Sequence, residues 1–284
     1  MAKPILSVSI SGGRTSGYMS KWLIDNKRNE YDLNFVFANT GQEHEKTLDF
    51  VDRGDREWGL GVTWVEAVVH HGIRKGSTHK VVNYKTASRN GEPFEQVCKK
   101  YGLSNMTFQP CNRELKLNPM KSYRKELDDG LVAIGIRADE VDRINPNYES
   151  LGLVYPLAFW NPTTKEQVRH WWKEQPFDLE IPEHLGNCVT CWKKSDRKLM
   201  TIAKHEPERF DFFKKMEKEH GFSGAPTYDE NGEQVKRLWF RNYRTCDDII
   251  ATSKKPFNEF IDNMPELQLD LLGLDQNLSC LFQQ

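Results

Sequence analysis

A loop with the composition of an anion site lies near the start of the chain and consists of Ser11, Gly12, Gly13, Arg14, Thr15 and Ser16. Two adjacent glycines allow a tight turn whose backbone N–H groups point inward, and the hydroxyl side chains add hydrogen-bond donors. A helix that starts directly after such a turn contributes the positive end of its dipole. We therefore expect this loop to bind a phosphate group. Its spacing matches neither a Walker loop nor G-x-G-x-x-G.

Three cysteines have the spacing and context of ligands. Cys188 and Cys191 form a C-x-x-C pair, and Cys111 falls in the first turn of a predicted helix. That position, followed by Arg113 and Lys116, favours the thiolate form. In a reducing compartment disulfides are disfavoured, so a metal ion, an iron–sulfur cluster or a redox dithiol is expected.

Two arginines follow a predicted strand at 131–136. Arg137 and Arg143 would then lie at the sheet edge where the Ser11 loop is expected, and two guanidinium groups there can clamp a polyphosphate. The alternative is a surface loop in which both arginines pair with the neighbouring acids. From these residues alone, the sequence favours neither interpretation.

The elements that must position these residues alternate between strand and helix. Strands are predicted at 5–10, 31–39 and 62–69, with helices from Gly17 and over 43–58. This alternation predicts an α/β fold with a doubly wound, mostly parallel sheet. Polar residues end the second strand, where open α/β sheets bind ligands. They are Asn39, Thr40, Gly41 and Glu43.

Two stretches are open to more than one interpretation. Residues 70–103 are polar, basic and broken by glycines, which predicts a surface loop or an insertion that grips substrate. Within this stretch, His70 and His71 are expected to be solvated rather than to bind metal. Residues 236–244 mix arginines with Trp239, Phe240 and Tyr243; they fit a packed C-terminal element or a surface that binds single-stranded nucleic acid.

Composition sets the class of protein. The chain has 284 residues, 38% of them hydrophobic, with a net charge of -1, so it can bury a full core and carries no global field toward nucleic acid or membrane. No apolar run approaches 18 residues and the N-terminal run is too short for a signal peptide, so a cytoplasmic protein is expected. We expect a nucleotide-binding domain at 1–180 with a C-x-x-C, helical and irregular extension packed on it at 181–284.

The order of these motifs resembles the PP-loop superfamily and, within it, the phosphoadenosine phosphosulfate (PAPS) reductase family. Five family motifs occur in register across residues 5–200. They are S-G-G-x-[DT]-S at 11–16, D/N-T-G-x-E at 39–43, the cysteine before x-x-x-L-K at 111–116, G-x-R-x-x-E-x-x-R at 135–143, and Y-P-L-x-x-W at 155–160 ahead of C-x-x-C.

This resemblance implies a Rossmann-like sheet that binds an adenine nucleotide at the carboxyl ends of its strands. The ligand is ATP with Mg²⁺, or a sulfonucleotide such as PAPS or adenosine phosphosulfate (APS). Cys111, Arg137 and Arg143 take the catalytic positions, and Gly135 and Glu140 join the nucleotide-binding residues of the first two motifs.

Two departures from the family pattern separate its branches. Cluster-containing reductases carry a second cysteine where this chain has Asn112, and reductases end in a Glu-Cys-Gly-x-His tail that is absent here. Cys111, Cys188 and Cys191 resemble instead the ATP-dependent branch in which three thiolates hold a 4Fe-4S cluster with one iron open to sulfide. Zinc on the same cysteines, with His184 or Cys246 as fourth ligand, is the structural alternative.

Three functions therefore follow from the sequence. The first is ATP-dependent adenylation and sulfur transfer onto a nucleobase, nucleic acid or small substrate. The second is sulfonucleotide reduction with Cys280 as the attacking thiolate, although Cys280 also fits a packing role in a terminal helix. The third is nucleotide sensing or nucleic-acid binding without catalysis. A homo-oligomer is compatible with all three.

Overall fold

The computed structural model describes residues 2–72, 74–127 and 130–262. Their strands form one mixed sheet in the order β4-β3-β2-β1-β5-β6. The strands are β1 (Ile5–Ile10), β2 (Asp32–Ala38), β3 (Thr63–Val68), β4 (Thr78–Val82), β5 (Leu131–Ala133) and β6 (Leu153–Val154). All neighbouring pairs are parallel except β3 and β4. The predicted mostly parallel α/β sheet is confirmed.

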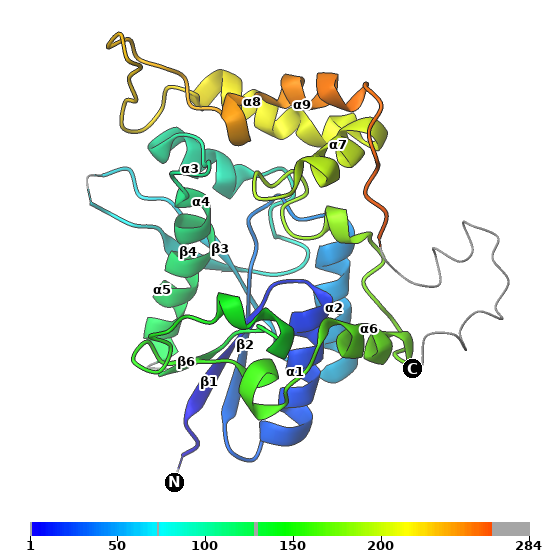
Figure 1. Cartoon of the computed structure of the whole chain (residues 1–284). Coiled ribbons are helices and arrows are strands. Elements are labelled where there is room, and N and C mark those ends of the chain that lie inside the picture. Colours follow the sequence, from blue (N-terminus) through cyan, green and yellow to red (C-terminus); the bar gives the residue numbers. More distant parts are fainter. Residues whose placement is uncertain (1, 73, 128–129, 263–284) are drawn as a thin grey trace, which may run out of the picture.

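Helices cover both faces of this sheet, which makes it doubly wound (Figure 1). On one face lie α1 (Arg14–Lys27) and α2 (Glu45–Trp58), and on the other lies α5 (Asn118–Leu127). Alternation along β2 explains this arrangement. Phe35 and Phe37 belong to the core that includes residues of α1 and α2, whereas Val36 and Ala38 pack against side chains of α5.

The segment at 70–103 is more ordered than predicted. It contains the antiparallel edge strand β4 and a helix, α3 (Glu92–Tyr101), so the prediction of a surface loop was wrong over these two elements. The polar composition hid this strand from the sequence analysis because an edge strand exposes one side to solvent. The side chain of Val81 in β4, for example, is 60% exposed. The Nε2 atom of His70 hydrogen-bonds with Thr78 at 2.7 Å, within this ordered structure.

Three helices lie beyond the end of the sheet where the parallel strands finish (Figure 1). They are α7 (Asp196–His205), α8 (Asp211–His220) and α9 (Cys246–Ser253). The helix α6 (Lys165–Lys173) packs against α1 instead, and Thr164 caps it through a reciprocal pair with Gln167. The sequence did not predict α9, whose start is marked by the same kind of cap between Thr245 and Asp248.

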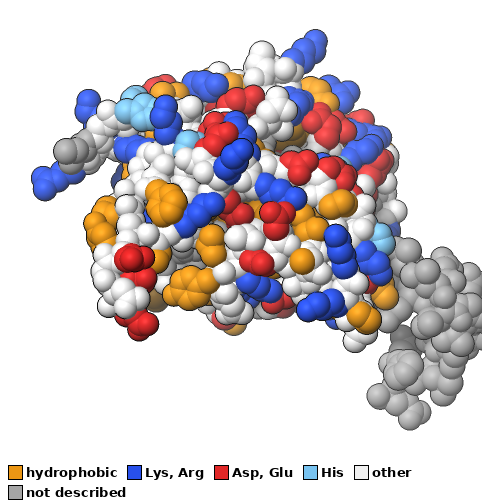
Figure 2. All heavy atoms as spheres, turned by 90° about the horizontal axis from the view of Figure 1, so that it is seen from above, with side chains coloured by type: hydrophobic (Ala, Val, Ile, Leu, Met, Phe, Trp, Pro, Cys, Tyr) orange, Lys and Arg blue, Asp and Glu red, His pale blue; other side chains and the backbone are white. Residues whose placement is uncertain are grey.

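Two of the three aromatic residues of 236–244 pack inward. Trp239 is 1% exposed and stacks on Phe213 with ring centroids 4.0 Å apart, and Phe240 is 3% exposed. These two rings are therefore not available to stack on bases, which removes most of the motivation for a nucleic-acid-binding module here. The face over α7, α8 and α9 also mixes acidic and basic side chains (Figure 2). Tyr243 remains 91% exposed.

One hydrophobic cluster spans the predicted boundary at 180. It joins Phe50 and Trp172 to Leu185, Phe213 and Trp239. The two-part division at 180/181 stays a prediction. Among the described residues, no helix is long and apolar enough to cross a membrane.

We predict that Gly12→Ala destabilises the protein by about 2–4 kcal/mol. Gly12 has φ of 77°, and an added Cβ would lie 2.4 Å from Cγ2 of Thr47, so left-handed strain and overpacking both contribute. Gly232→Ala is the matched control, because its φ is 79° but a Cβ would meet nothing within 4 Å. Urea unfolding should therefore show a loss of only about 1–2 kcal/mol for that variant. Equal losses would contradict the packing contribution.

Candidate functional site

The Ser11 loop is held in shape by one buried hydroxyl. Ser16 Oγ accepts from the backbone N–H of Ser11 at 3.2 Å and donates to the carbonyl of Gly13 at 2.9 Å. Ser16 is 3% exposed and its hydroxyl is already committed to the turn. Its role is therefore to fix the shape of the loop.

The N-terminus of α1 is open toward an anion. Gly13 is its N-cap residue and makes no side-chain cap, and the first turn contains no acidic residue, so the described part of the chain offers no internal substitute for a ligand there. The unpaired N–H groups and the helix dipole both favour a negative group. This geometry is that of the predicted phosphate cradle.

A cavity of about 430 Å³ opens in front of this cradle. Cationic side chains outnumber carboxylates on its walls, which suits a polyanion. The cations are Arg14, Arg137, Arg143, Lys165 and Arg169, and the carboxylates are Glu140, Glu183 and Asp262. Gly135 also lines the cavity, so the predicted 135–143 loop meets the Ser11 loop.

Arg137 and Arg143 both line the cavity and both pair with neighbouring acids, and their clamping of a polyphosphate stays a prediction. Arg137 Nη1 donates to Thr15 Oγ1 at 3.1 Å, and its Nε donates to Asp139 at 2.9 Å. Arg137 thus reaches the cradle while its charge is balanced by an acid. Arg143 pairs with Glu140 and stays 58% exposed at the cavity wall, so it has freedom to turn toward a ligand.

The guanidinium of Arg14 is already hydrogen-bonded within the protein. Its Nε donates to Asp178 at 2.7 Å and its Nη2 to the carbonyl of Leu179 at 2.5 Å. This guanidinium ties the cradle to the segment that follows α6. A nucleotide contact through the Arg14 side chain stays a prediction that would require these bonds to exchange.

The second-strand motif lies away from the cradle cavity. Asn39 is fully buried and donates to Glu66 at 2.7 Å, and the backbone N–H of Gly41 donates to Asn39 Oδ1 at 3.3 Å. Thr40 lines a second cavity, and its hydroxyl hydrogen-bonds with the carboxylate of Glu43. None of the four lines the cradle cavity. Thr40 and Glu43 instead contact Cys188, and a role of the four residues in nucleotide binding stays a prediction.

That second cavity, of about 470 Å³, is lined by Cys111, Cys188 and Cys191. Cys188 is placed by a backbone bridge to Glu43 and by a hydrogen bond from the N–H of Val189 to the carbonyl of Gln42 at 3.2 Å. Cys111 lies in a short helix, α4 (Pro110–Asn112), that continues as a π-helix at Arg113–Leu117. Cys111 and the Cys188/Cys191 pair, which are at least 77 residues apart in the sequence, thereby share one cavity.

Burial governs the protonation of the cysteines in the C-x-x-C pair. Burial, together with the charge of Glu43, raises the pKa of Cys188 to about 12, and burial also raises that of Cys191. Burial opposes the charge on Lys116, but the neighbouring Cys188 and Glu43 outweigh it, and the pKa of Lys116 is raised. Buried thiols beside an ammonium are neutral without a metal and lose protons when one binds.

The three cysteine sulfurs are too widely spaced in this structure to bind one zinc ion together. In the described chain, the three sulfurs do not all lie within 4.8 Å of one another, whereas tetrahedral zinc with bonds of about 2.3 Å requires closer sulfurs. The thiolates of a cluster bind different irons and are farther apart. Neither proposed fourth zinc ligand, His184 or Cys246, lines the cavity.

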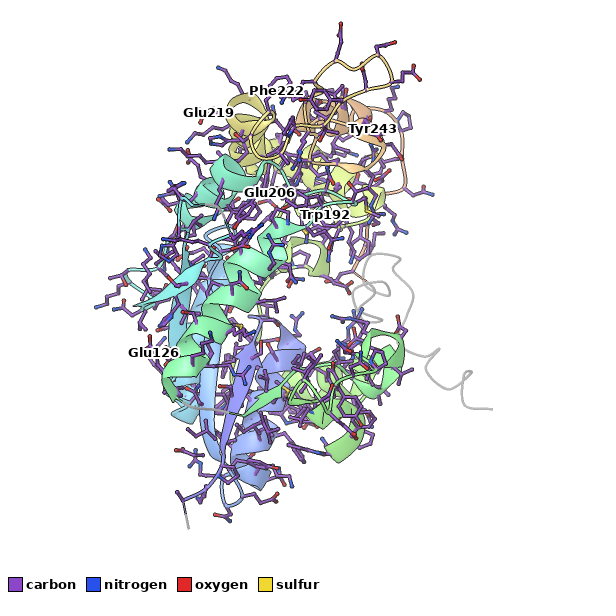
Figure 3. The ribbon with its side chains drawn as sticks, turned by 90° about the vertical axis from the view of Figure 1, so that its left-hand side faces the viewer. Glu126, Trp192, Glu206, Glu219, Phe222 and Tyr243 are labelled. Carbon is purple, nitrogen blue, oxygen red and sulfur yellow. The ribbon has the colours of Figure 1, made fainter. Side chains whose placement is uncertain are left out.

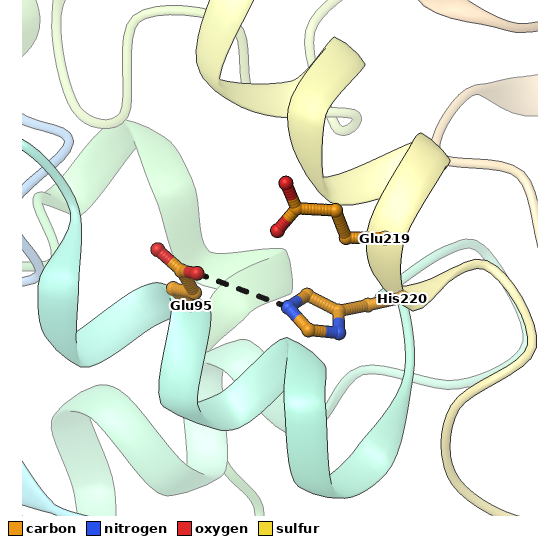
Figure 4. Close-up of side chains that lie close together, drawn as sticks. All are labelled: Glu95, Glu219 and His220. Atoms are coloured by element: carbon orange, nitrogen blue, oxygen red, sulfur yellow. Dashed lines mark ion pairs between the residues drawn. The ribbon is translucent and has the colours of Figure 1, made fainter.

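A group of metal-type ligands that does meet this distance lies elsewhere, between α3 and α8 (Figure 4). It consists of Glu95, Glu219 and His220. Glu95 is already paired with Lys215 at 2.9 Å, which supplies the positive charge that an ion would bring.

Glu183 and Asn187 line both cavities, so the cradle and the cysteines adjoin. Glu183 accepts from Lys165 and from Lys198, each at 2.7 Å. Asn187 has φ of 58°, a conformation in which asparagine is enriched among non-glycine residues. Figure 3 shows Trp192, next to Cys191, at the junction of the sheet and the helices above it. Sequence reasoning missed both shared residues; their place just before the C-x-x-C was the available signal.

The sequence model of a protein family, the phosphoadenosine phosphosulfate reductase domain, matches residues 5–174 of this chain. The chain belongs to this family. A nin region protein of Escherichia phage lambda, ORF290, is 34% identical over 252 residues, which is 85% of this chain and 82% of that protein. A Methanocaldococcus jannaschii protein, MJ0973, is 23% identical over 248 residues, 82% of this chain and 51% of that protein.

Two solved structures resemble the family member described here. A PAPS reductase of Candida auris in a phosphate complex has a TM-score of 0.38 and 16% identity, covering 60% of this chain and 72% of that one. The U34-tRNA thiolase NcsA of Methanococcus maripaludis, with its 4Fe-4S cluster, has a TM-score of 0.36 and 14% identity, covering 89% and 72%.

We predict that Glu183→Gln lowers the stability of the protein by about 1 kcal/mol at pH 7, a value reduced by partial exposure. Burial opposes the charge on Glu183, but its hydrogen bonds from Lys165 and Lys198 prevail and lower its pKa from 4.5 to about 2. The stabilisation is therefore complete above about pH 4.5 and is lost as the pH falls toward 2.

Urea unfolding from pH 7 to pH 3 measures this effect. The difference between wild type and Glu183→Gln should shrink on acidification. Glu180→Gln, in which the replaced side chain is 63% exposed and pairs with Lys46, should differ little from wild type throughout. A difference for Glu183→Gln that grows toward low pH would contradict the sign.

Proposed function

We propose that this PAPS reductase family protein binds ATP in the cradle and uses it to adenylate an acceptor that then receives sulfur. The supporting observation is the wall shared by the two cavities: an anion site at the start of α1 adjoins a three-cysteine site through Glu183 and Asn187. The acceptor is a nucleobase, free or in a nucleic acid, or a small molecule with an activatable oxygen.

The first step is attack of the acceptor oxygen on the α-phosphorus of ATP, with pyrophosphate leaving and taking the electrons of the broken P–O bond. Backbone N–H groups at Gly13 to Thr15 bind the phosphates, and Arg137 and Arg143 stabilise charge on the departing pyrophosphate. Mg²⁺ bound with ATP supplies further neutralisation. A sulfur nucleophile then attacks the activated carbon and displaces AMP.

The second part of the proposal assigns Cys111, Cys188 and Cys191 to a 4Fe-4S cluster. When bound, such a cluster supplies an iron with an open position for sulfide. Lys116, whose ammonium lies 3.9 Å from Glu43, offsets the charge of three thiolates in a half-buried cavity. Thr40, whose hydroxyl lies 3.5 Å from the sulfur of Cys188, helps to orient that thiolate.

Sulfonucleotide reduction is the second candidate, and the description of the matched family favours it. Its proposed nucleophile, Cys280, lies outside the described residues. Sulfite release from PAPS or APS with a thiol donor, lost in Cys280→Ser, would support this candidate. Sulfite release unchanged in that variant would exclude Cys280 as the nucleophile.

We expect anaerobic reconstitution to load about four irons per chain, and each of Cys111→Ser, Cys188→Ser and Cys191→Ser to lose most of this iron and the visible absorption of the cluster. Cys98→Ser and Cys246→Ser are matched controls, because both cysteines are buried and neither lines the cavity. Iron, sulfide and zinc analysis measures the outcome. Stoichiometric zinc without sulfide would contradict the cluster assignment, as would full iron loading in the Cys188 variant.

We expect Arg137→Ala to lower ATP–pyrophosphate exchange by about 10²–10³-fold, because a preorganised cation is lost where charge develops. Arg56→Ala is the control, since Arg56 is 70% exposed on α2 and pairs only locally with Asp52. Melting temperatures should show that both variants are folded. Exchange at the wild-type rate in Arg137→Ala would contradict the role of this arginine.

A further inference from the structure

The last described segment of the chain returns to the cradle. Residues 254–262, here called the strap, leave α9 and descend along one side of the molecule (Figure 1). The strap is held to α7 by polar contacts: the N–H of Phe260 donates to Thr201 Oγ1 at 2.8 Å, and Arg197 donates to the carbonyl of Glu259 at 3.1 Å. The ammonium of Lys198 lies 4.6 Å from the ring centre of Phe260.

The strap ends its described course with a carboxylate in the anion cavity. Asp262 lines that cavity with a side chain only 17% exposed. Its Oδ2 accepts from the backbone N–H of Glu183 at 2.7 Å. Its Oδ1 is buried, makes no hydrogen bond with the described residues, and lies 3.6 Å from Nη2 of Arg169.

We propose that Asp262 is a built-in competitor for the cradle, so that a polyphosphate binds by displacing its carboxylate from Arg169. A carboxylate and a phosphate repel each other at short range in a half-buried cavity and use the same type of cation. The strap is attached through single hydrogen bonds, cation–aromatic contacts and the surface ion pairs of Glu259 with Lys204 and His205, which can open without unfolding the core. This inference rests on the proposed nucleotide site and adds its regulation.

Displacement has a structural consequence next to the cysteines. Glu183 loses the acceptor of its backbone N–H when Asp262 leaves, and Glu183 forms part of the wall that the two cavities share. Occupation of the cradle is thereby linked to release of the strap from the segment that leads to Cys188. The apparent affinity for anions is the intrinsic affinity multiplied by the fraction of molecules in which the strap is released.

Asp262→Asn tests the competition with inorganic pyrophosphate and with ATP as probes, using calorimetry on the full chain. Removal of the charge should tighten binding of both probes by roughly tenfold. Asp247→Asn is the matched control, because Asp247 is an 80% exposed carboxylate on α9 that pairs with Lys214 and does not line the cavity. We expect that variant to bind within about twofold of wild type.

Hydrogen exchange at the Glu183 amide gives a second, independent measurement. Adding pyrophosphate to the wild type should speed this exchange by fivefold or more, because the amide loses its acceptor. Equal affinities of wild type and Asp262→Asn, or slowed exchange at Glu183, would overturn the competition while leaving the nucleotide site intact. An equal gain in Asp247→Asn would overturn the role of the Asp262 charge. Absence of binding by all three proteins would overturn the proposed function as well.

Discussion

The site depends on one backbone contact between distant parts of the chain. The loop after β2 pairs with the C-x-x-C loop through the Glu43–Cys188 bridge and the hydrogen bond from Val189 to Gln42. Without this pairing, Cys188 and Cys191 would not face the cavity that also contains Cys111. The buried carboxylate of Glu43 reinforces it, because it lies 3.9 Å from Lys116 on the π-helix that follows Cys111. Such π-turns are frequent at functional sites.

Several cations that line the cradle cavity are paired with carboxylates. Arg14 is paired with Asp178, Arg137 with Asp139, and Lys165 with Glu183, each within 3 Å. Cations gathered without a ligand would repel one another, so carboxylates hold them apart and oriented. The same pairs mean that a polyanion must exchange partners when it binds. Preorganisation of the cradle therefore comes mainly from the α1 backbone, whose first turn has no side-chain cap and no acidic residue.

Local patterns predicted the parts of the fold where a single physical signal dominates. Alternating and continuous apolar runs located β1, β2 and β3, and the glycine turn located the start of α1. The same reasoning failed at β4, because an edge strand with one exposed side lacks the apolar content of a buried strand. It also failed at α9, where an eight-residue helix in a polar stretch offers little periodicity beyond its cap.

Sequence by itself determined which groups are available: the anion-binding loop, the two arginines, the three cysteines and membership of the PAPS reductase domain family, because residue type and spacing are local properties. Only the tertiary structure decided which of these residues contact one another. It placed Thr40 and Glu43 against Cys188, buried Trp239, and brought Asp262 into the cavity in front of the Ser11 loop. These contacts join residues far apart in the chain, and the packing that selects them depends on the whole core rather than on any one motif.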